Sequence, residues 1–249
     1  ILHEKSFGLF LDGGHDLGEV LLPHREVPGD YVIGEELEVF LYTDSEDRPV
    51  ATLRVPLAMP GEYAKLKCVD TTDVGAFLDW GLPKELLVPF REQKRRMDVG
   101  KSYLVQVKFD PVSERIFASA RMERGLNQTD PHFKVGDEVG LIIYEQSDLG
   151  YKAIIDGTHS GLIFHNQVFQ PLQIGEKTQG YIAGIRDDGK IDLTLHAPRA
   201  RRVGSLEESI LAELEARGGF WSIGDHSSAE EIHDEFGVSK RTFKQAIGA

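Results

Sequence analysis

The stretch GAFLDWG, residues 75–81, recurs earlier in the chain as GLFLDGG, residues 8–14. The two copies share the first glycine, the phenylalanine, the leucine, the aspartate and the last glycine. In an extended strand alternate side chains face opposite ways, so Phe77 shares a face with Asp79, and Leu78 lies on the other face. The aliphatic face is the expected core. A large aromatic side chain is therefore expected on the polar face, where folding alone gives it no role.

These two stretches are part of a longer repeat, which has a looser third copy. Each copy has a first glycine and a later glycine. They are 26, 25 and 25 residues apart in the pairs Gly8–Gly34, Gly75–Gly100 and Gly150–Gly175. The matching segments include VLLPHRE (20–26) with LLVPFRE (86–92), and TDSEDRPVATLR (43–54) with DPVSERIFASAR (110–121). A spacing that recurs three times predicts an internal repeat. Each copy alternates apolar and polar residues between tight turns and is too short for a two-sheet sandwich, so we expect a five-stranded barrel of the OB type.

The pattern changes to helical spacing near the C-terminus. Ser205 with Glu208 and Ser228 with Glu231 have the spacing of capping boxes, and Ser239 is a candidate N-cap. The expected core residues of this region are Ile232, Phe236, Val238, Phe243 and Ile247. Two helices joined by a glycine turn resemble a winged-helix or helix-turn-helix module, whose second helix often enters a groove of DNA. Its exposed cations would be Lys240, Arg241 and Lys244, although a protein-interaction module is an equal alternative.

The sequence thus predicts a mainly β protein with a C-terminal α module: three tandem OB-fold barrels followed by a winged-helix-like domain. The expected domains are residues 1–60, 61–126, 132–198 and 203–249, with linkers at 59–62, 127–131 and 197–202. The sequence leaves open whether the first barrel has its first strand and whether the last domain is complete.

Composition limits the function classes. The chain has 249 residues, a net charge of −13 and one cysteine, Cys68. A single cysteine excludes an internal disulfide framework, and no apolar run approaches the ~18–20 residues that span a bilayer, so we expect a cytoplasmic protein. The net charge argues against coating nucleic acid by charge alone. Only residues 61–125 are net basic, with 12 Lys and Arg against 10 Asp and Glu, so any nucleic-acid contact must rest on local basic and aromatic patches.

Three phrases of the repeat resemble the RNA-binding barrel repeat of ribosomal protein S-one. They are G-x-F-x-D, V-G-x-x-x-x-V and the hairpin D-x-x-x-x-R-I-x-x-S. The resemblance implies that the phenylalanine is exposed and stacks on a base, and that a histidine and a basic hairpin residue line the same face. The family's histidine position holds Pro23, Pro89 and Phe164 here, and the third copy has Lys152 in place of the phenylalanine. The candidate RNA-binding residues are Phe7, Phe10, His24, Arg48, Lys65, Lys67, Phe77, Phe90, Arg91, Arg115, Tyr151, Lys152, His165 and Lys190.

Three such barrels followed by a winged helix are similar to the bacterial conserved virulence factor B family. That resemblance implies a cytoplasmic protein that binds single-stranded RNA, regulates gene expression and has no catalytic activity. We expect no cofactor and no metal, because His15, Asp16 and His24 lack a recurrent ligand spacing. Two alternatives stay open: a DNA-binding transcription regulator that acts through the winged helix, and an accessory subunit of a nuclease. The oligomeric state is not predicted.

Overall fold

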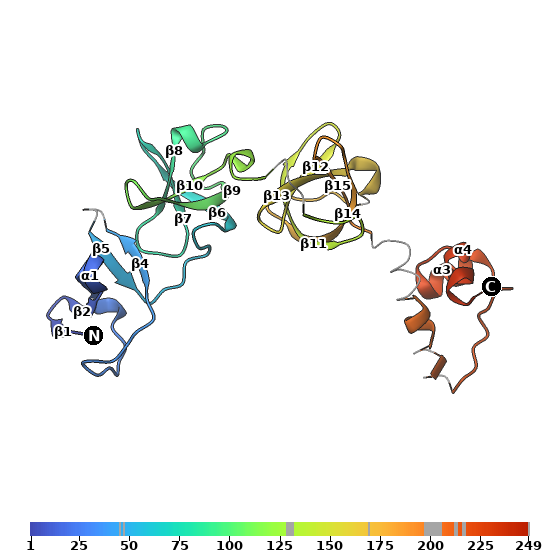
Figure 1. The fold of residues 1–249 in the computed structure, drawn as a ribbon, viewed down its shortest axis with the longest axis horizontal. Coiled ribbons are helices and arrows are strands. Elements are labelled where there is room, and N and C mark those ends of the chain that lie inside the picture. The colour runs from blue at the N-terminus through green and yellow to red at the C-terminus, as the bar shows by residue number, and fades with distance from the viewer. Residues whose placement is uncertain are drawn as a thin grey trace.

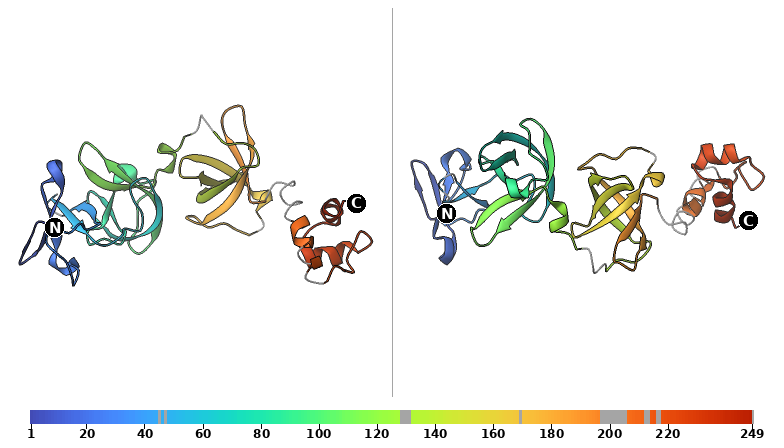
Figure 2. Two further views of the ribbon diagram at one scale, coloured as in Figure 1. Left: turned by 60° about the horizontal axis from the view of Figure 1, so that its bottom comes forward. Right: turned by 90° about the horizontal axis from the view of Figure 1, so that it is seen from above.

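A computed structural model describes residues 1–44, 46, 48–127, 132–168, 170–196, 206–211, 214–215 and 218–248. Three five-stranded β units follow one another along the chain, and helices form the C-terminal part (Figure 1). Figure 2 shows the same succession from two other directions. The prediction of a mainly β protein with three barrels and a C-terminal α module is confirmed. Three predicted features lie outside the described residues: the linker at 197–202, most of the linker at 127–131, and the N-cap Ser205.

The first barrel is an open sheet with the strand order β1-β2-β3-β5-β4. Its elements are β1 (His3–Lys5), β2 (Gly8–Asp12), α1 (Gly14–Leu17), β3 (Glu19–Pro23), η1 (His24–Glu26), β4 (Phe40–Thr43) and β5 (Pro49–Thr52). A first strand is present as β1, which has three residues and places His3 opposite Phe10 on β2. Leu9 and Leu11 point into the core, which leaves Phe10 on the outer face.

The second and third barrels repeat this arrangement with longer first strands. The second has the order β10-β9-β6-β7-β8, and the third closes as β11-β12-β13-β15-β14. The second contains β6 (Tyr63–Thr71), β7 (Gly75–Asp79), β8 (Leu86–Pro89), η2 (Phe90–Glu92), β9 (Ser102–Asp110), β10 (Arg115–Ser119) and η3 (Met122–Arg124). The third contains β11 (Glu138–Gln146), β12 (Gly150–Ile155), β13 (His159–Phe164), η4 (His165–Gln167), β14 (Lys177–Ile185) and β15 (Ile191–Thr194). The predicted aliphatic face is buried, with Ala76 1% and Leu78 0% exposed.

The repeated first glycine has a steric cause. Gly8, Gly75 and Gly150 begin β2, β7 and β12, and a Cβ at each would collide with a carbonyl oxygen of the neighbouring strand. A side chain there would push the two strands apart, so only glycine allows this close approach. The spacing that defines the repeat therefore marks the same point of each barrel.

Apolar contacts join the three barrels. Phe40 and Tyr42 on β4 of the first barrel pack against the core of the second, and the rings of Phe40 and Trp80 meet edge to face at 5.8 Å. A separate buried cluster joins the second barrel to the third, and we call it the seam: Tyr63, Leu104, Met122, Leu126, Tyr144 and Ile154. The barrels are thus packed on one another.

The C-terminal part contains α3 (Ala229–Phe236) and α4 (Lys240–Ala246). The capping box of Ser228 and Glu231 is present, and the Ser239 hydroxyl accepts a hydrogen bond from the Thr242 N–H at 3.2 Å, as predicted. Ile232 and Phe243 are buried, but Ile247 is 38% exposed, so its prediction as a core residue is wrong. Ile247 lies at the C-cap, where α4 ends. No helix in the described part of the chain has the length and apolar character needed to cross a membrane.

Candidate nucleic-acid interface

The outer face of the first barrel carries an aromatic cluster with a cation. The Phe10 ring lies 4.8 Å from the His3 ring and 5.6 Å from the Phe7 ring, and Lys5 Nζ lies 4.5 Å from the centre of the Phe10 ring. Phe7 is 54% exposed. We call His3, Lys5, Phe7 and Phe10 the first platform. Aromatic faces beside a positive charge suit an unpaired base and its phosphate.

The second barrel places Phe77 at the corresponding position of β7, half-buried on the outer face. Asp70 lies opposite it on β6, where the first barrel has His3. Lys67 is opposite Asp79, so it is a diagonal neighbour of Phe77 on the same face. Lys65 and Lys67 are both exposed, and the stem of Lys65 lies beside Gly175 of the third barrel. The second face thus combines one aromatic ring with charges of both signs.

The third barrel has an ion pair at the same place. Lys152 lies opposite Glu145, and its Nζ is 2.6 Å from Glu145 Oε1. Lys94 of the second barrel reaches the other carboxylate oxygen at 2.5 Å and also binds Glu123 at 2.7 Å. Burial favours a raised pKa for Glu145, but the hydrogen bonds from Lys152 and Lys94 outweigh it and lower the pKa. The ion pairs at Glu145 therefore link the second barrel to the third, and this position presents no aromatic ring.

Tyr151 does not fit its predicted role. It is 5% exposed and belongs to the core of the third barrel, because it precedes Lys152 on β12 and faces inward. Its ring meets that of His165 at 5.3 Å. A buried ring in the barrel core cannot receive a base, so the structure does not support this candidate.

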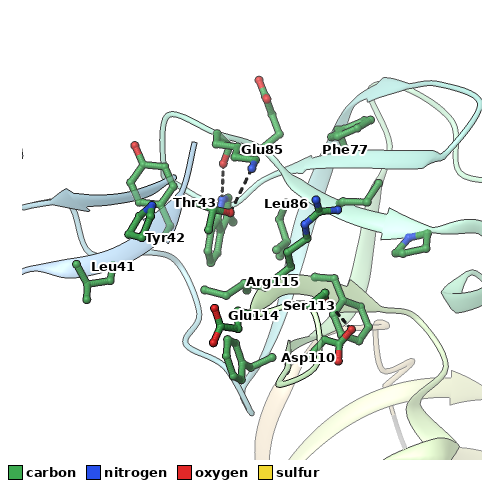
Figure 3. Close-up of a pocket in the computed structure, with 18 of the residues that line it drawn as sticks. Leu41, Tyr42, Thr43, Phe77, Glu85, Leu86, Asp110, Ser113, Glu114 and Arg115 are labelled. Carbon is green, nitrogen blue, oxygen red and sulfur yellow. Dashed lines mark hydrogen bonds between the residues drawn. The ribbon is translucent and has the colours of Figure 1, made fainter. Parts of the chain in front are cut away.

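A groove of about 730 Å³ lies between the first and second barrels. Figure 3 shows Leu41, Tyr42 and Thr43 of β4 on one side of it, and Phe77, Leu86 and Arg115 of the second barrel on the other. Arg91 also lines the groove, so three predicted site residues, Phe77, Arg91 and Arg115, come together here. The lining includes three basic and three acidic residues: Lys84, Arg91, Arg115, Glu85, Asp110 and Glu114. With these charges balanced, a ligand in the groove would gain mainly from its apolar and aromatic walls.

One acidic member of this lining, Asp110, is held in place by hydrogen bonds. Ser113 Oγ donates a 2.7 Å hydrogen bond to Asp110 Oδ2. This bond, together with the Val112 backbone N–H and the nearby charge of Arg91, lowers the pKa of Asp110. Asp110 is therefore a fixed negative charge that partly neutralises Arg91.

Two predicted hairpin cations are bound within their own turns. Arg48 donates to Asp44 Oδ2 at 2.9 and 2.7 Å and lies 2.9 Å from Glu46. Lys190 Nζ lies 2.6 Å from Asp188 Oδ2. Both side chains are exposed, but a phosphate would have to compete with these carboxylates. Their predicted backbone contacts stay predictions.

The residues that follow the third strand of each barrel begin short 3-10 helices. His24, Phe90 and His165 start η1, η2 and η4. His24 is exposed, His165 Nε2 lies 2.9 Å from the Ser147 carbonyl oxygen, and the guanidinium carbon of Arg96 stacks 3.4 Å from the centre of the Phe90 ring. These side chains therefore leave the strand face, because the backbone turns after the proline or phenylalanine that ends the strand.

The repeated R-E phrase has a structural role in the first two barrels. The Glu26 and Glu92 side chains are 5% and 13% exposed. Glu92 accepts a 2.7 Å hydrogen bond from Ser119 Oγ, and Glu26 accepts one from Thr52 Oγ1. Each glutamate ties its 3-10 helix to the last strand of its barrel. This explains the repeat of the glutamate without a ligand.

In the C-terminal part, the predicted cations lie on α4. Arg241 is exposed, and Lys240 and Lys244 are half-buried. Hydrogen bonds with Ser228 lower the pKa of Glu231, and the charge of Lys240 contributes. Lys240 thus already has a carboxylate nearby.

The list of candidate RNA-binding residues omits His3, Lys5 and Arg96. The first two alternate in the short phrase HEK at residues 3–5, which gives a weak strand signal. Arg96 ends the phrase KRR, but its contact with Phe90 depends on the loop conformation. In the described part of the chain, no group of three or more His, Cys, Asp or Glu residues is arranged to hold a metal ion.

Comparisons with known proteins agree with this architecture. Residues 1–54 match the S1 domain, and residues 208–249 match the CvfB-like winged helix domain. The chain is 29% identical over 255 residues to the uncharacterized protein YitL of Bacillus subtilis, covering 99% of this chain and 84% of that protein. It is 24% identical to conserved virulence factor B of Staphylococcus epidermidis, covering 88% and 76% of the two chains.

The Staphylococcus aureus conserved virulence factor B is 25% identical and covers 87% of this chain and 74% of its own. The predicted resemblance to the conserved virulence factor B family is confirmed. A solved multidomain protein with nucleic acid binding domains from Streptococcus pneumoniae covers 100% of this chain and 89% of its own, at 23% identity and a TM-score of 0.43. The S1 and winged-helix matches indicate nucleic-acid binding.

Proposed function

We propose that this protein binds single-stranded RNA and regulates gene expression through that binding, as a cytoplasmic protein without catalytic activity. The observation that carries the proposal is the first platform, in which the Phe10 ring lies close to His3, to Lys5 and to the exposed Phe7. This platform lies within the S1 domain match. The regulatory role rests on the resemblance to the conserved virulence factor B family.

Single-stranded RNA suits the platform better than a duplex. A base in a duplex is already stacked, whereas an unpaired base gains ~1–3 kcal/mol from an aromatic side chain. With a net charge of −13, the protein cannot gain enough from phosphates over a long duplex. Affinity would then come from a few stacked bases on Phe10 and Phe77, with phosphate contacts from nearby lysines and arginines. A protein that binds RNA in this way needs no catalytic residues.

Titration with a labelled single-stranded RNA of mixed sequence tests the proposal. Phe10→Ala and Phe77→Ala should each weaken binding, whereas Phe220→Ala should not, because Phe220 is 78% exposed but lies outside the barrels. Competition with single-stranded and duplex DNA of the same sequence tests the alternative in which α4 carries the binding. RNA that is cut in the presence of Mg²⁺ would contradict the absence of catalysis.

A further inference from the structure

The loop that follows η2 has three consecutive cations, Lys94, Arg95 and Arg96, in two different states. Lys94 is bound by Glu123 and Glu145 across to the third barrel. Arg95 and Arg96 are exposed, and within the described residues no carboxylate forms an ion pair with either. Asp98 lies within electrostatic reach of Arg95, but it is bonded to Lys101 at 2.8 Å. Two positive charges are therefore available at this surface.

Arg96 is held flat by Phe90. Its guanidinium carbon lies 3.4 Å from the centre of the Phe90 ring, which is a stacking distance. Because Arg96 is exposed, the outer face of the guanidinium plane and its N–H edges point to solvent. Bases stack on such arginine planes in RNA-binding proteins. The Phe90–Arg96 pair thus presents a cationic stacking surface.

A small cavity of about 200 Å³ adjoins this pair and is also lined by Gln93. Gln93 is 4% exposed, and its Nε2 donates a 2.9 Å hydrogen bond to the Val88 carbonyl oxygen. Its Oε1 has no hydrogen-bond partner among the described residues. A buried carbonyl oxygen without a partner is costly.

We propose that this loop is a nucleotide-binding subsite, in which a base stacks on the Arg96 guanidinium and Arg95 binds the adjoining phosphate. The inference rests on the proposed function, because the ligand is the same single-stranded RNA. The loop lies near the Phe77 face, since Pro89 at the end of β8 is paired with Gly75 at the start of the Phe77 strand. The flat Phe90–Arg96 stack favours RNA over an acidic peptide, which would use the charge but not the plane.

The test compares Arg96→Gln, Arg95→Gln and Phe90→Leu with Lys177→Gln, which removes an exposed lysine of β14 in the third barrel. Arg96→Gln should weaken single-stranded RNA binding about tenfold, through loss of one stacked base. Arg95→Gln should reduce the slope of log affinity against log salt by about 0.7, through loss of one phosphate contact. Phe90→Leu should weaken RNA binding about as much as Arg96→Gln does. The double variant Phe90→Leu with Arg96→Gln should bind no worse than Arg96→Gln alone. Lys177→Gln should change affinity less than about twofold, because it removes one exposed charge and no stacking surface.

The outcomes separate the two proposals. If Phe77→Ala weakens RNA binding but Arg95→Gln and Arg96→Gln behave like Lys177→Gln, the subsite is overturned and the proposed function stands. If the unmodified protein does not bind RNA, the proposed function itself fails. If decaglutamate displaces RNA and loses its own binding in Arg96→Gln as strongly as RNA does, the loop is an acidic-peptide site and base stacking is overturned. Thermal melting of each variant confirms that it is folded.

Discussion

Replacing Phe10 by alanine removes the centre of the first platform. The ring is in contact with His3 and Phe7 and lies under Lys5, so its loss removes the stacking surface and leaves the lysine without its ring. The stacking surface is worth ~1–3 kcal/mol per base, which corresponds to a roughly 5- to 150-fold weaker affinity for single-stranded RNA. The cost in stability should be smaller than for a core residue. A fully buried phenylalanine loses ~3–5 kcal/mol on truncation, and Phe10 is only half-buried, so we expect about 2 kcal/mol.

The neighbouring residue gives a matched control. Leu9 is 0% exposed and faces the core from the same strand, so Leu9→Ala should cost ~2–5 kcal/mol of stability. Its affinity per folded molecule should stay unchanged. The assay is an anisotropy titration with labelled RNA and a thermal melt of the same samples. The reasoning is refuted if Phe10→Ala lowers the melting temperature as much as Leu9→Ala while the folded protein binds RNA with unchanged affinity.

Three further predictions concern the whole chain and the seam. The slope of log affinity against log salt should be shallow, about −2 to −4, because about three to six phosphates are contacted; a steeper slope would reveal a continuous basic groove. Lys94→Gln should lower the free energy of unfolding in urea by about 1 kcal/mol, since it breaks two partly exposed ion pairs between barrels, and an unchanged midpoint would contradict this. Burial raises the pKa of Tyr144 to about 12, so the folded state holds this proton more tightly than the unfolded chain, whose tyrosine has a pKa near 10. Stability should therefore fall by about 1–2 kcal/mol as pH rises from about 10 to 12, and Tyr144→Phe should remove most of that fall in pH-dependent urea unfolding.

The sequence was enough to predict the repeat and the outer position of Phe10 and Phe77. It could do so because the glycine at the start of each second strand is sterically required, and because the alternation of a strand assigns the faces. The same alternation argues against Tyr151 as an RNA-binding residue. Tyr151 precedes Lys152 on the strand, so when Lys152 faces outward Tyr151 must face the core.

Other features depend on tertiary packing that no local pattern records. The groove around Phe77 exists because β4 of the first barrel packs on the second. Lys94 and Glu145 are 51 residues apart in the sequence and meet only across the seam. The carboxylates that bind Arg48 and Lys190 are visible in the turn sequences, but their contacts depend on the turn conformation. For these reasons the sequence placed Phe10 and Phe77 on the correct face, placed Tyr151 wrongly, and was less informative about which charges are available.

Competition binding tests the central claim most directly. A labelled single-stranded RNA is bound by the full chain, and unlabelled single-stranded RNA, duplex RNA and duplex DNA of the same sequence are added as competitors. The account predicts that single-stranded RNA displaces the label at the lowest concentration and that Phe10→Ala with Phe77→Ala abolishes this preference. Displacement by duplex DNA at a lower concentration than by single-stranded RNA, unaffected by the two substitutions, would contradict it.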